Sequence, residues 1–211
     1  MILGISGSPR PNSVTASAVK RVLAESGEDT EYISLAGKKI SGCISCLGCT
    51  SKNMCVVKDD FLEIAEAMTR ADAIVFGAPN YFNQPNALSH CLWERCFCFR
   101  HKDGFLLENK LGVIISTGYS NEEKNNPVIQ TIEMFMNRNK MKVVSKFTVG
   151  AYSQCYDCKQ GIGCKVGNIV KDHGFVDELT HEMYPKKFEN QQTSILKCDN
   201  AAKCLKNMLN E

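Results

Sequence analysis

ILGISGSPRPNSVT, residues 2–15, is the stretch that decides the fold of this 211-residue chain. Its first five residues form an apolar run typical of a buried strand, and a polar loop follows. A helical pattern then continues to about residue 25, with Val19, Val22 and Leu23 on one face. The stretch therefore predicts a strand, a loop and a helix, the first unit of an α/β fold.

The rest of the chain repeats this alternation of strand and helix. We predict strands at 30–35, 71–79, 111–118 and 142–150, and helices at 61–71, 86–98, 125–139, 168–184 and 195–209. Five strands separated by helices predict a doubly wound, five-stranded parallel sheet with helices on both faces. Ligands bind such sheets beyond the carboxyl ends of the strands, which here means the loops 6–15, 79–84 and 116–120.

The length of the chain fits one large domain with an extension. We expect residues 1–150 to form the domain, including a cysteine loop at 41–58. Residues 151–211 are expected to form a cysteine-containing C-terminal extension packed on the same domain. Within it, the polar segment 186–194 is predicted to be a mobile linker.

Charge and hydropathy exclude several classes of protein. Lys and Arg number 25 and Asp and Glu number 23, so the net charge of +2 gives no broad positive field for nucleic acid. No apolar run approaches the ~20 residues of a membrane span, and the first residues do not resemble a signal peptide. We therefore expect a cytoplasmic protein with neither nucleic acid nor a membrane as its partner.

Four of the twelve cysteines, Cys43, Cys46, Cys49 and Cys55, lie in the segment GCISCLGCTSKNMC. A reducing cytosol disfavours a disulfide scaffold, so this clustering indicates metal or redox chemistry. Closely spaced thiolates in one loop can surround an iron–sulfur cluster. Structural zinc more often uses two separated pairs, so the spacing favours a cluster over zinc, and buried apolar thiols are the third alternative.

The loop 6–15 offers hydroxyl groups, the Arg10 guanidinium and the free amides of a helix N-terminus. These groups suit a phosphate, because helix amides and an arginine both favour an anion. The loop is neither a Walker loop nor a GxGxxG fingerprint. The alternative is an ordinary helix start capped by Ser or Asn.

Several segments together resemble a known family. GSPRPNSVT after the first strand, APNYFNQP after the third and STG after the fourth resemble the NAD(P)H-dependent FMN reductase branch of the flavodoxin-like superfamily. The resemblance covers residues 1 to about 150. Within that branch, the CxxCxxC loop followed by Asp59 and Asp60 resembles the iron–sulfur flavoproteins. It implies a flavodoxin-like fold, one FMN, and a 4Fe–4S cluster that exchanges electrons with the flavin.

The resemblance also implies which residues hold these cofactors. The FMN phosphate would be bound by Ser8, Arg10, Asn12, Ser13, Val14 and Thr15. The isoalloxazine ring would be lined by Pro79, Asn80, Tyr81, Phe82, Asn83, Ser116, Thr117 and Gly118. Tyr81 and Phe82 could instead be core aromatic residues. The cluster ligands would be Cys43, Cys46, Cys49 and Cys55.

A second cysteine group, Cys155, Cys158 and Cys164, follows the fifth strand and is predicted to reach the same sheet edge. It is one ligand short of a four-cysteine metal site. The fourth ligand could be Cys198, Cys204, a cysteine of the 86–98 helix (Cys91, Cys96, Cys98) or a residue of a neighbouring subunit. A second cluster, a zinc ion and a reactive thiol set remain open.

No side chain is predicted to be a catalytic acid or base, and neither the scattered histidines nor Trp93-Glu94-Arg95 is given a role. The leading hypothesis is an FMN- and iron–sulfur-dependent oxidoreductase that takes electrons from a ferredoxin-like donor and reduces a small acceptor. One alternative is an NAD(P)H-dependent FMN or quinone reductase without a cluster, and another is a non-catalytic redox carrier or sensor. The resemblance implies a homodimer or homotetramer.

Overall fold

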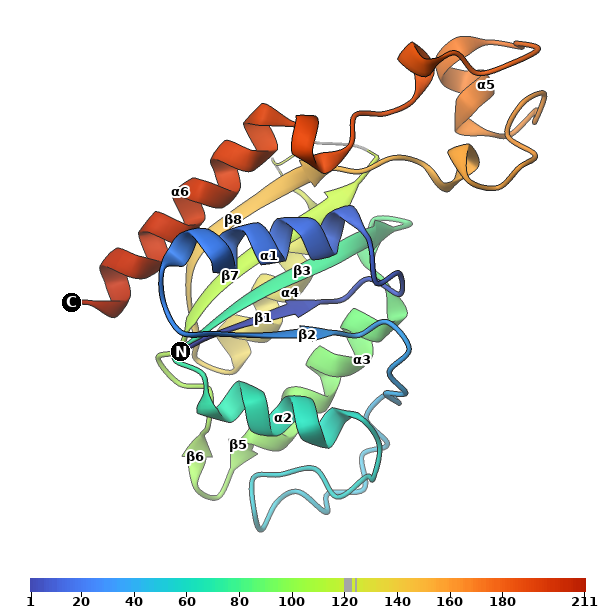
Figure 1. Cartoon of the computed structure of the whole chain (residues 1–211). Helices are drawn as coiled ribbons and strands as arrows, with labels where there is room; N and C mark the ends of the chain where they lie inside the picture. Colours follow the sequence, from blue (N-terminus) through green and yellow to red (C-terminus); the bar gives the residue numbers. More distant parts are fainter. Residues whose placement is uncertain (120–122, 124) are drawn as a thin grey trace.

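The computed structural model describes residues 1–119, 123 and 125–211. Five parallel strands form its central sheet, in the order β2-β1-β3-β7-β8 (Figure 1). Their bounds are Ile2–Ser6 for β1, Thr30–Ser34 for β2, Ala73–Tyr81 for β3, Leu111–Gly118 for β7 and Lys142–Gly150 for β8. The predicted flavodoxin-like sheet is confirmed, and the strand order reverses between β1 and β3, where such folds bind ligands.

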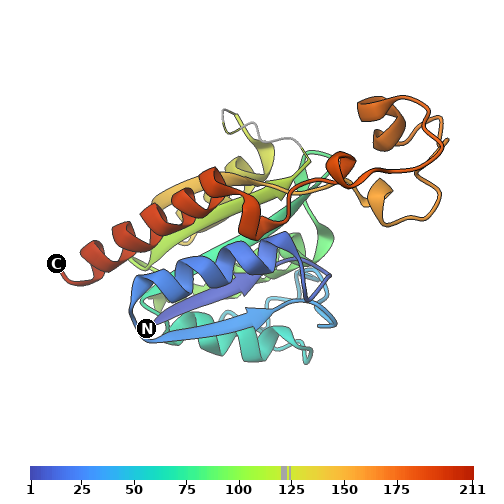
Figure 2. The same ribbon diagram turned by 45° about the horizontal axis from the view of Figure 1, so that its top comes forward.

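Helices cover both faces of the sheet (Figure 1). On one face lie α1 (Val14–Ser26) and α6 (Gln192–Leu209), which contact each other (Figure 2). On the other face lie α2 (Phe61–Arg70), α3 (Ala87–Arg95) and α4 (Pro127–Arg138). Each face has its own apolar core, because the strands are buried on both sides. None of the described helices is long and apolar enough to cross a membrane.

The turn from β1 into α1 is held tightly against the neighbouring strand. The Gly7 amide donates to the Gly77 carbonyl at 2.7 Å, and Asn86 donates to the Gly7 carbonyl at 2.8 Å. A Cβ at Gly7 would lie only 2.0 Å from Ser89 Oγ, so this position requires glycine. Ser13 then caps α1 by accepting from the Ala16 amide at 3.1 Å.

Short elements follow β3. The two-residue strand β4 (Gln84–Pro85) pairs antiparallel with the end of β3. After α3 comes the 3-10 helix η1 (Cys96–Phe99), so the predicted helix 86–98 ends earlier than expected. A small hairpin of β5 (Arg100–His101) and β6 (Gly104–Phe105) then precedes β7, and the sequence pattern did not predict it.

The C-terminal extension differs most from the sequence prediction. The predicted helix 168–184 is wrong, because α5 (Asn168–His173) ends at Gly174, whose φ of 75° breaks the helix. Only 3-10 turns follow, η3 (His181–Met183) and η4 (Phe188–Asn190), and η4 occupies the segment predicted to be a linker. Helix α6 begins at Gln192 rather than 195. The segment carrying α5 projects beyond the sheet while α6 returns to pack on α1 and β8 (Figures 1 and 2).

Candidate functional site

A cavity of about 460 Å³ lies at the carboxyl ends of the strands, beside the switch in strand order. It is large enough for a cofactor, since ligand pockets commonly measure about 300–1,000 Å³. Most of the residues predicted to bind FMN line it: Ser8, Arg10, Ser13, Val14, Thr15, Pro79, Asn80, Tyr81, Phe82, Thr117 and Gly118. Three separate loops therefore meet at one cavity, as the topology requires.

Three predicted residues do not line this cavity. Asn12 lines a neighbouring cavity, Ser116 is buried in β7, and Asn83 is exposed at the turn between β3 and β4. Phe82 and Asn83 have φ angles of 53° and 60°. These values lie in the left-handed region of backbone conformation, which residues other than glycine rarely adopt. Phe82 is fully exposed and Tyr81 is exposed, so the alternative that they are core aromatic residues is wrong.

Other residues line the cavity that the sequence pattern did not predict. They are Tyr119, at the end of β7, and Ala151, Tyr152, Ser153, Gln154 and Asn168 of the C-terminal extension. Gln154 donates to the Tyr81 hydroxyl at 3.3 Å and so ties the extension to the loop after β3. No motif marks these residues, because they reach the cavity only through the path of the chain after β8. The one available signal was that β8 ends at the same sheet edge.

The side of the cavity formed by the loop 6–15 carries one charged network. Arg10 Nη1 donates to Asp157 Oδ2 at 2.8 Å and to the Tyr152 hydroxyl at 3.2 Å, and that hydroxyl donates to the same carboxylate at 2.9 Å. The hydrogen bond to Asp157 raises the pKa of Arg10 above its usual value, so the guanidinium stays charged. Together with the N-terminus of α1, it gives this side of the cavity the chemistry of an anion site.

The four-cysteine loop forms a second site. Cys43, Cys46, Cys49 and Cys55 all line one small cavity, together with Cys98 of η1 and apolar side chains. Ser45 and Leu47, which lie between the first three cysteines, have φ angles of 53° and 58°. Such left-handed residues reverse the chain locally, and they persist only where the surrounding structure holds them. The loop is thus shaped so that its thiols share one cavity.

These thiols fit an iron–sulfur cluster in their donor chemistry. A single zinc ion holds its thiolates about 2.3 Å from the metal. In the described ranges, no three Cys, His, Asp or Glu side chains converge closely enough to hold one ion. Burial, together with the neighbouring thiols Cys55, Cys43 and Cys46, raises the pKa of Cys49, and a cationic iron centre would offset that cost. Closely spaced cysteine thiolates are the donors that iron–sulfur clusters take.

Two side chains outside the loop also contact its cysteines. His101 Nε2 lies 3.1 Å from Cys49 Sγ, within hydrogen-bond distance of a predicted ligand. Cys98 is buried and lines the same cavity, and burial raises the pKa of its thiol to about 12.

The loop is closed at its base by a carboxylate. Burial raises the pKa of Asp59, but hydrogen bonds from Arg95 and from the Ser41 and Phe61 amides bring it below its usual value. The Asp59 carboxylate therefore stabilises the fold above the unfolded pKa of about 3.9, and this contribution is lost as pH falls through the lower folded pKa.

We expect acid to weaken the base of this loop selectively. The difference in free energy of unfolding between the wild type and Asp59→Asn should be largest near neutral pH and should shrink as pH falls below about 4. Denaturant unfolding at a series of pH values measures this difference. A difference that stays constant down to about pH 3 would contradict the assignment.

The second cysteine group lies elsewhere. Cys155 Sγ accepts the Asn168 amide at 3.3 Å, and the Cys158 thiol donates to the Cys155 carbonyl at 3.2 Å. A hydrogen bond from Ser153 and the Asn168 amide lower the pKa of Cys155. Asn168 and Ser153 also line the large cavity, so Cys155 lies directly behind its wall.

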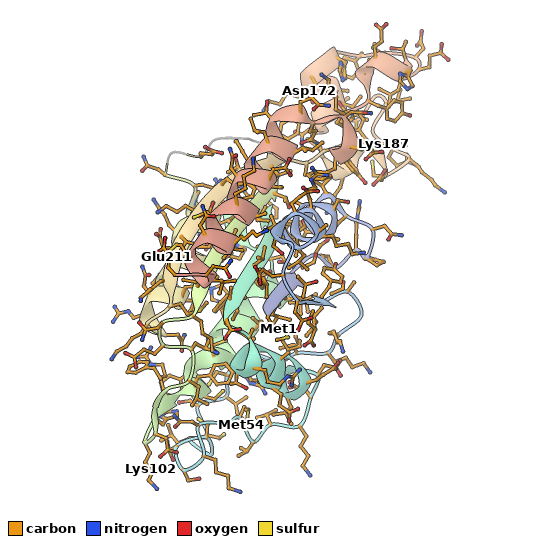
Figure 3. The ribbon with its side chains drawn as sticks, turned by 60° about the vertical axis from the view of Figure 1, so that its left-hand side comes forward. Met1, Met54, Lys102, Asp172, Lys187 and Glu211 are labelled. Atoms are coloured by element: carbon orange, nitrogen blue, oxygen red, sulfur yellow. The ribbon has the colours of Figure 1, made fainter. Side chains whose placement is uncertain are left out.

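The two cysteine groups lie at opposite ends of the molecule. Figure 3 shows Asp172, next to the second group, far from Met54 of the four-cysteine loop, and Figure 1 agrees. Cys98 lies with the four-cysteine loop, and Cys91 and Cys96 precede it on α3 and η1. Cys198 is buried in the core between α6 and the sheet. These placements separate Cys91, Cys96, Cys98 and Cys198 from the second group, so the expectation that they could complete it is wrong.

A flavodoxin-like sheet with a cofactor-sized cavity at its switch point, in a chain whose four-cysteine loop surrounds a small cavity of its own, is typical of flavin-dependent oxidoreductases. Residues 1–154 match the family model described as NADPH-dependent FMN reductase. The chain belongs to this family and, within it, to the iron–sulfur flavoproteins.

One curated relative supports this assignment, and two solved structures share the fold. An iron–sulfur flavoprotein from Methanocaldococcus jannaschii is 39% identical over 189 residues, which cover 81% of this chain and 97% of that protein. An NAD(P)H:quinone oxidoreductase from Methanothermobacter marburgensis has a similar structure, with a TM-score of 0.60, 14% identity, and coverage of 97% and 98%. A flavone reductase has a similar fold, with a TM-score of 0.58 and 18% identity, and the chain spans 63% of its length.

Proposed function

We propose that this protein is an FMN- and iron–sulfur-dependent oxidoreductase that moves electrons between a 4Fe–4S cluster and FMN. The observation that carries the proposal is that all four loop cysteines line one cavity in a flavin reductase fold. The cluster would supply one-electron chemistry, and the flavin would supply both one- and two-electron chemistry. The chain itself would bind, orient and shield these groups.

The residues for FMN follow from the large cavity. Ser8, Ser13, Thr15 and Arg10 would bind the phosphate at the N-terminus of α1. Thr15 and Thr117 share a buried hydrogen bond of 2.6 Å, which fixes the phosphate loop against the end of β7. Pro79, Asn80, Tyr81, Phe82, Thr117 and Gly118 would surround the ring, with Asn12, Val14, Asn83 and Ser116 in supporting positions. Tyr152 and Asn168 of the C-terminal extension would form a further wall of the FMN site.

A place for the small acceptor adjoins this cavity. A second cavity of about 520 Å³ shares Tyr119, Ala151 and Tyr152 with it as a common wall. Its own side is lined by residues of the extension, including Tyr156, Asp172 and Gln191. The acceptor would therefore approach the flavin from the side of the C-terminal extension, which we propose to be part of the same domain.

Electron entry would involve a second copy of the chain. The cysteine cavity and the large cavity share no lining residue among those described, and their loops diverge from the sheet edge (Figure 1). A homodimer or homotetramer would allow the cluster of one subunit to approach the flavin of another. A ferredoxin-like donor suits a one-electron entry site, and NAD(P)H is the alternative donor.

Cofactor stoichiometry tests the proposal directly. Protein purified without oxygen should contain about four irons, the matching sulfide and one FMN per chain. Zinc instead of iron, or FMN alone, would favour the NAD(P)H-dependent reductase without a cluster. About eight irons would assign a second cluster to Cys155, Cys158 and Cys164, and one additional zinc would assign them to zinc.

Donor specificity separates the remaining alternatives. Reduced ferredoxin should reduce the bound flavin rapidly, and NADPH alone should do so slowly, as followed by flavin absorbance after rapid mixing. Rapid reduction by NADPH in protein that holds no iron would instead support the reductase. Protein that is reduced but passes electrons to no small acceptor would be a carrier or sensor.

A further inference from the structure

The end of helix α3 carries two charged residues, Glu94 and Arg95, to which the sequence assigned no role. In the structure, both side chains reach the four-cysteine loop. The Cys43 amide donates to Glu94 Oε2 at 2.9 Å, so Glu94 holds the first of the four cysteines by its backbone. Arg95 lines the cysteine cavity itself.

Arg95 connects the two ends of the loop. Its Nη1 donates to the Ser41 carbonyl at 3.1 Å, and its Nη2 donates to the Val57 carbonyl at 3.3 Å. Ser41 lies just before Cys43 and Val57 just after Cys55, so one guanidinium spans the whole ligand segment. Both nitrogens also donate to Asp59, at 2.8 Å and 3.2 Å. This fork geometry requires arginine, because a lysine ammonium cannot span two carbonyls and a carboxylate in one plane.

Burial, ion pairing and contact with an aromatic ring fix the position of the Arg95 side chain. The residue is 2% exposed, and its guanidinium lies 4.6 Å from the centre of the Phe61 ring. A buried charge is costly unless it is paired and hydrogen-bonded, and Asp59 provides the pairing. The segment between β2 and α2 has neither helix nor strand. Its base is closed by the Arg95–Asp59 pair and, next to it, by reciprocal hydrogen bonds between Lys39 and Asp60 at 2.6 Å and 3.2 Å.

One donor of the guanidinium remains for the cluster. Nε of Arg95 is buried and has no hydrogen-bond partner within the described part of the chain. Arg95 and Cys55 line the same cavity, so this donor belongs to the side chain that adjoins the predicted cluster ligands. Hydrogen bonds to cluster sulfurs and nearby charges set the reduction potential of iron–sulfur centres.

We propose that Glu94 and Arg95 are positioning residues that hold the four-cysteine loop in its ligand-binding shape, and that Arg95 raises the reduction potential of the bound cluster. The second half rests on the proposed function, because it requires a cluster in this loop. The first half does not, since it concerns hydrogen bonds between residues of the chain itself.

The first test measures the loop in the full-length chain without iron. Amide hydrogen exchange at residues 41–58 should speed up by about tenfold or more in Arg95→Gln and in Asp59→Asn, because each breaks the base of the loop. Glu94→Gln should speed exchange mainly at Cys43. Arg70→Gln is the matched control, because it removes an exposed arginine–carboxylate pair (Arg70–Glu31) and should leave the loop unchanged.

The second test distinguishes an effect of Arg95 on the reduction potential of the cluster from an effect on the fold of the loop alone. After anaerobic reconstitution, the reduction potential is measured by redox titration followed by electron paramagnetic resonance. Arg95→Gln removes a positive charge and a donor and should make the potential more negative. Asp59→Asn removes a negative charge and should move it in the opposite direction. A residue that only supported the fold would shift both variants in the same direction.

Each half of the proposal can be rejected separately. If folded Arg95→Gln exchanges the amide hydrogens of residues 41–58 at the rate of the parent chain, the positioning role is overturned. If that variant does not fold, Arg95→Lys decides, because it keeps the charge but cannot span Ser41 and Val57. Equal or same-direction potential shifts would overturn the tuning role. A parent chain that binds no iron would overturn both the tuning role and the proposed function, while the exchange data would still test the positioning role.

Discussion

Replacing Cys46 by serine is expected to remove the cluster from the protein. Cys46 is one of four thiols that line the cysteine cavity, and a serine hydroxyl is a poor ligand for iron compared with a thiolate. Iron and acid-labile sulfide per chain should fall from the parent level to near background after identical anaerobic purification. FMN content should remain near the parent level, because Cys46 does not line the large cavity.

Two controls make this result specific. Cys204→Ser changes a cysteine on α6, whose thiol donates to the Val144 carbonyl at 3.7 Å and does not line the cysteine cavity, and should keep all the iron. Cys158→Ser should also keep it if the second group is a thiol set, and should remove part of it if that group holds a cluster. Full iron retention in folded Cys46→Ser would remove the assignment of the loop as a cluster site.

Replacing Arg10 by glutamine is expected to weaken FMN binding by about 10–100-fold. A hydrogen bond to a charged group contributes about 1.5–3 kcal/mol, and each 1.4 kcal/mol is a factor of ten in affinity. Arg10 lines the large cavity beside the N-terminus of α1, where the FMN phosphate is proposed to bind. Titration of the cofactor-free protein, followed by FMN fluorescence, measures the dissociation constant.

A substitution of Asp157, the ion-pair partner of Arg10, should have the opposite effect on FMN affinity. Asp157 holds one guanidinium nitrogen and is itself an anion close to the proposed phosphate. Asp157→Asn should therefore leave FMN affinity unchanged or increase it, opposite in sign to Arg10→Gln. Arg21→Gln is a suitable control, because Arg21 lies on α1 but pairs with Asp199 away from the cavity. Parent-like affinity in Arg10→Gln would show that the phosphate lies elsewhere.

Most of the sheet could be predicted from the sequence, because each buried strand is a continuous apolar run and each helix has a periodic face. The C-terminal extension could not be predicted in the same way. Its helix α5 is short and polar, and its course depends on Gly174 and on contacts with Tyr81 and Arg10 rather than on periodicity. The residues that line the large cavity from this side were missed for the same reason.

The sequence by itself determined the strand–loop–helix opening of residues 2–26 and the four-cysteine loop, because both are local patterns whose residues lie close together in the chain. Only the tertiary structure decided what Arg95 and Tyr152 do. Arg95 meets Asp59 across 36 positions, and Tyr152 meets Arg10 across 142. Contacts of this range leave no periodicity in the sequence, because they depend on how the sheet brings distant loops to one place.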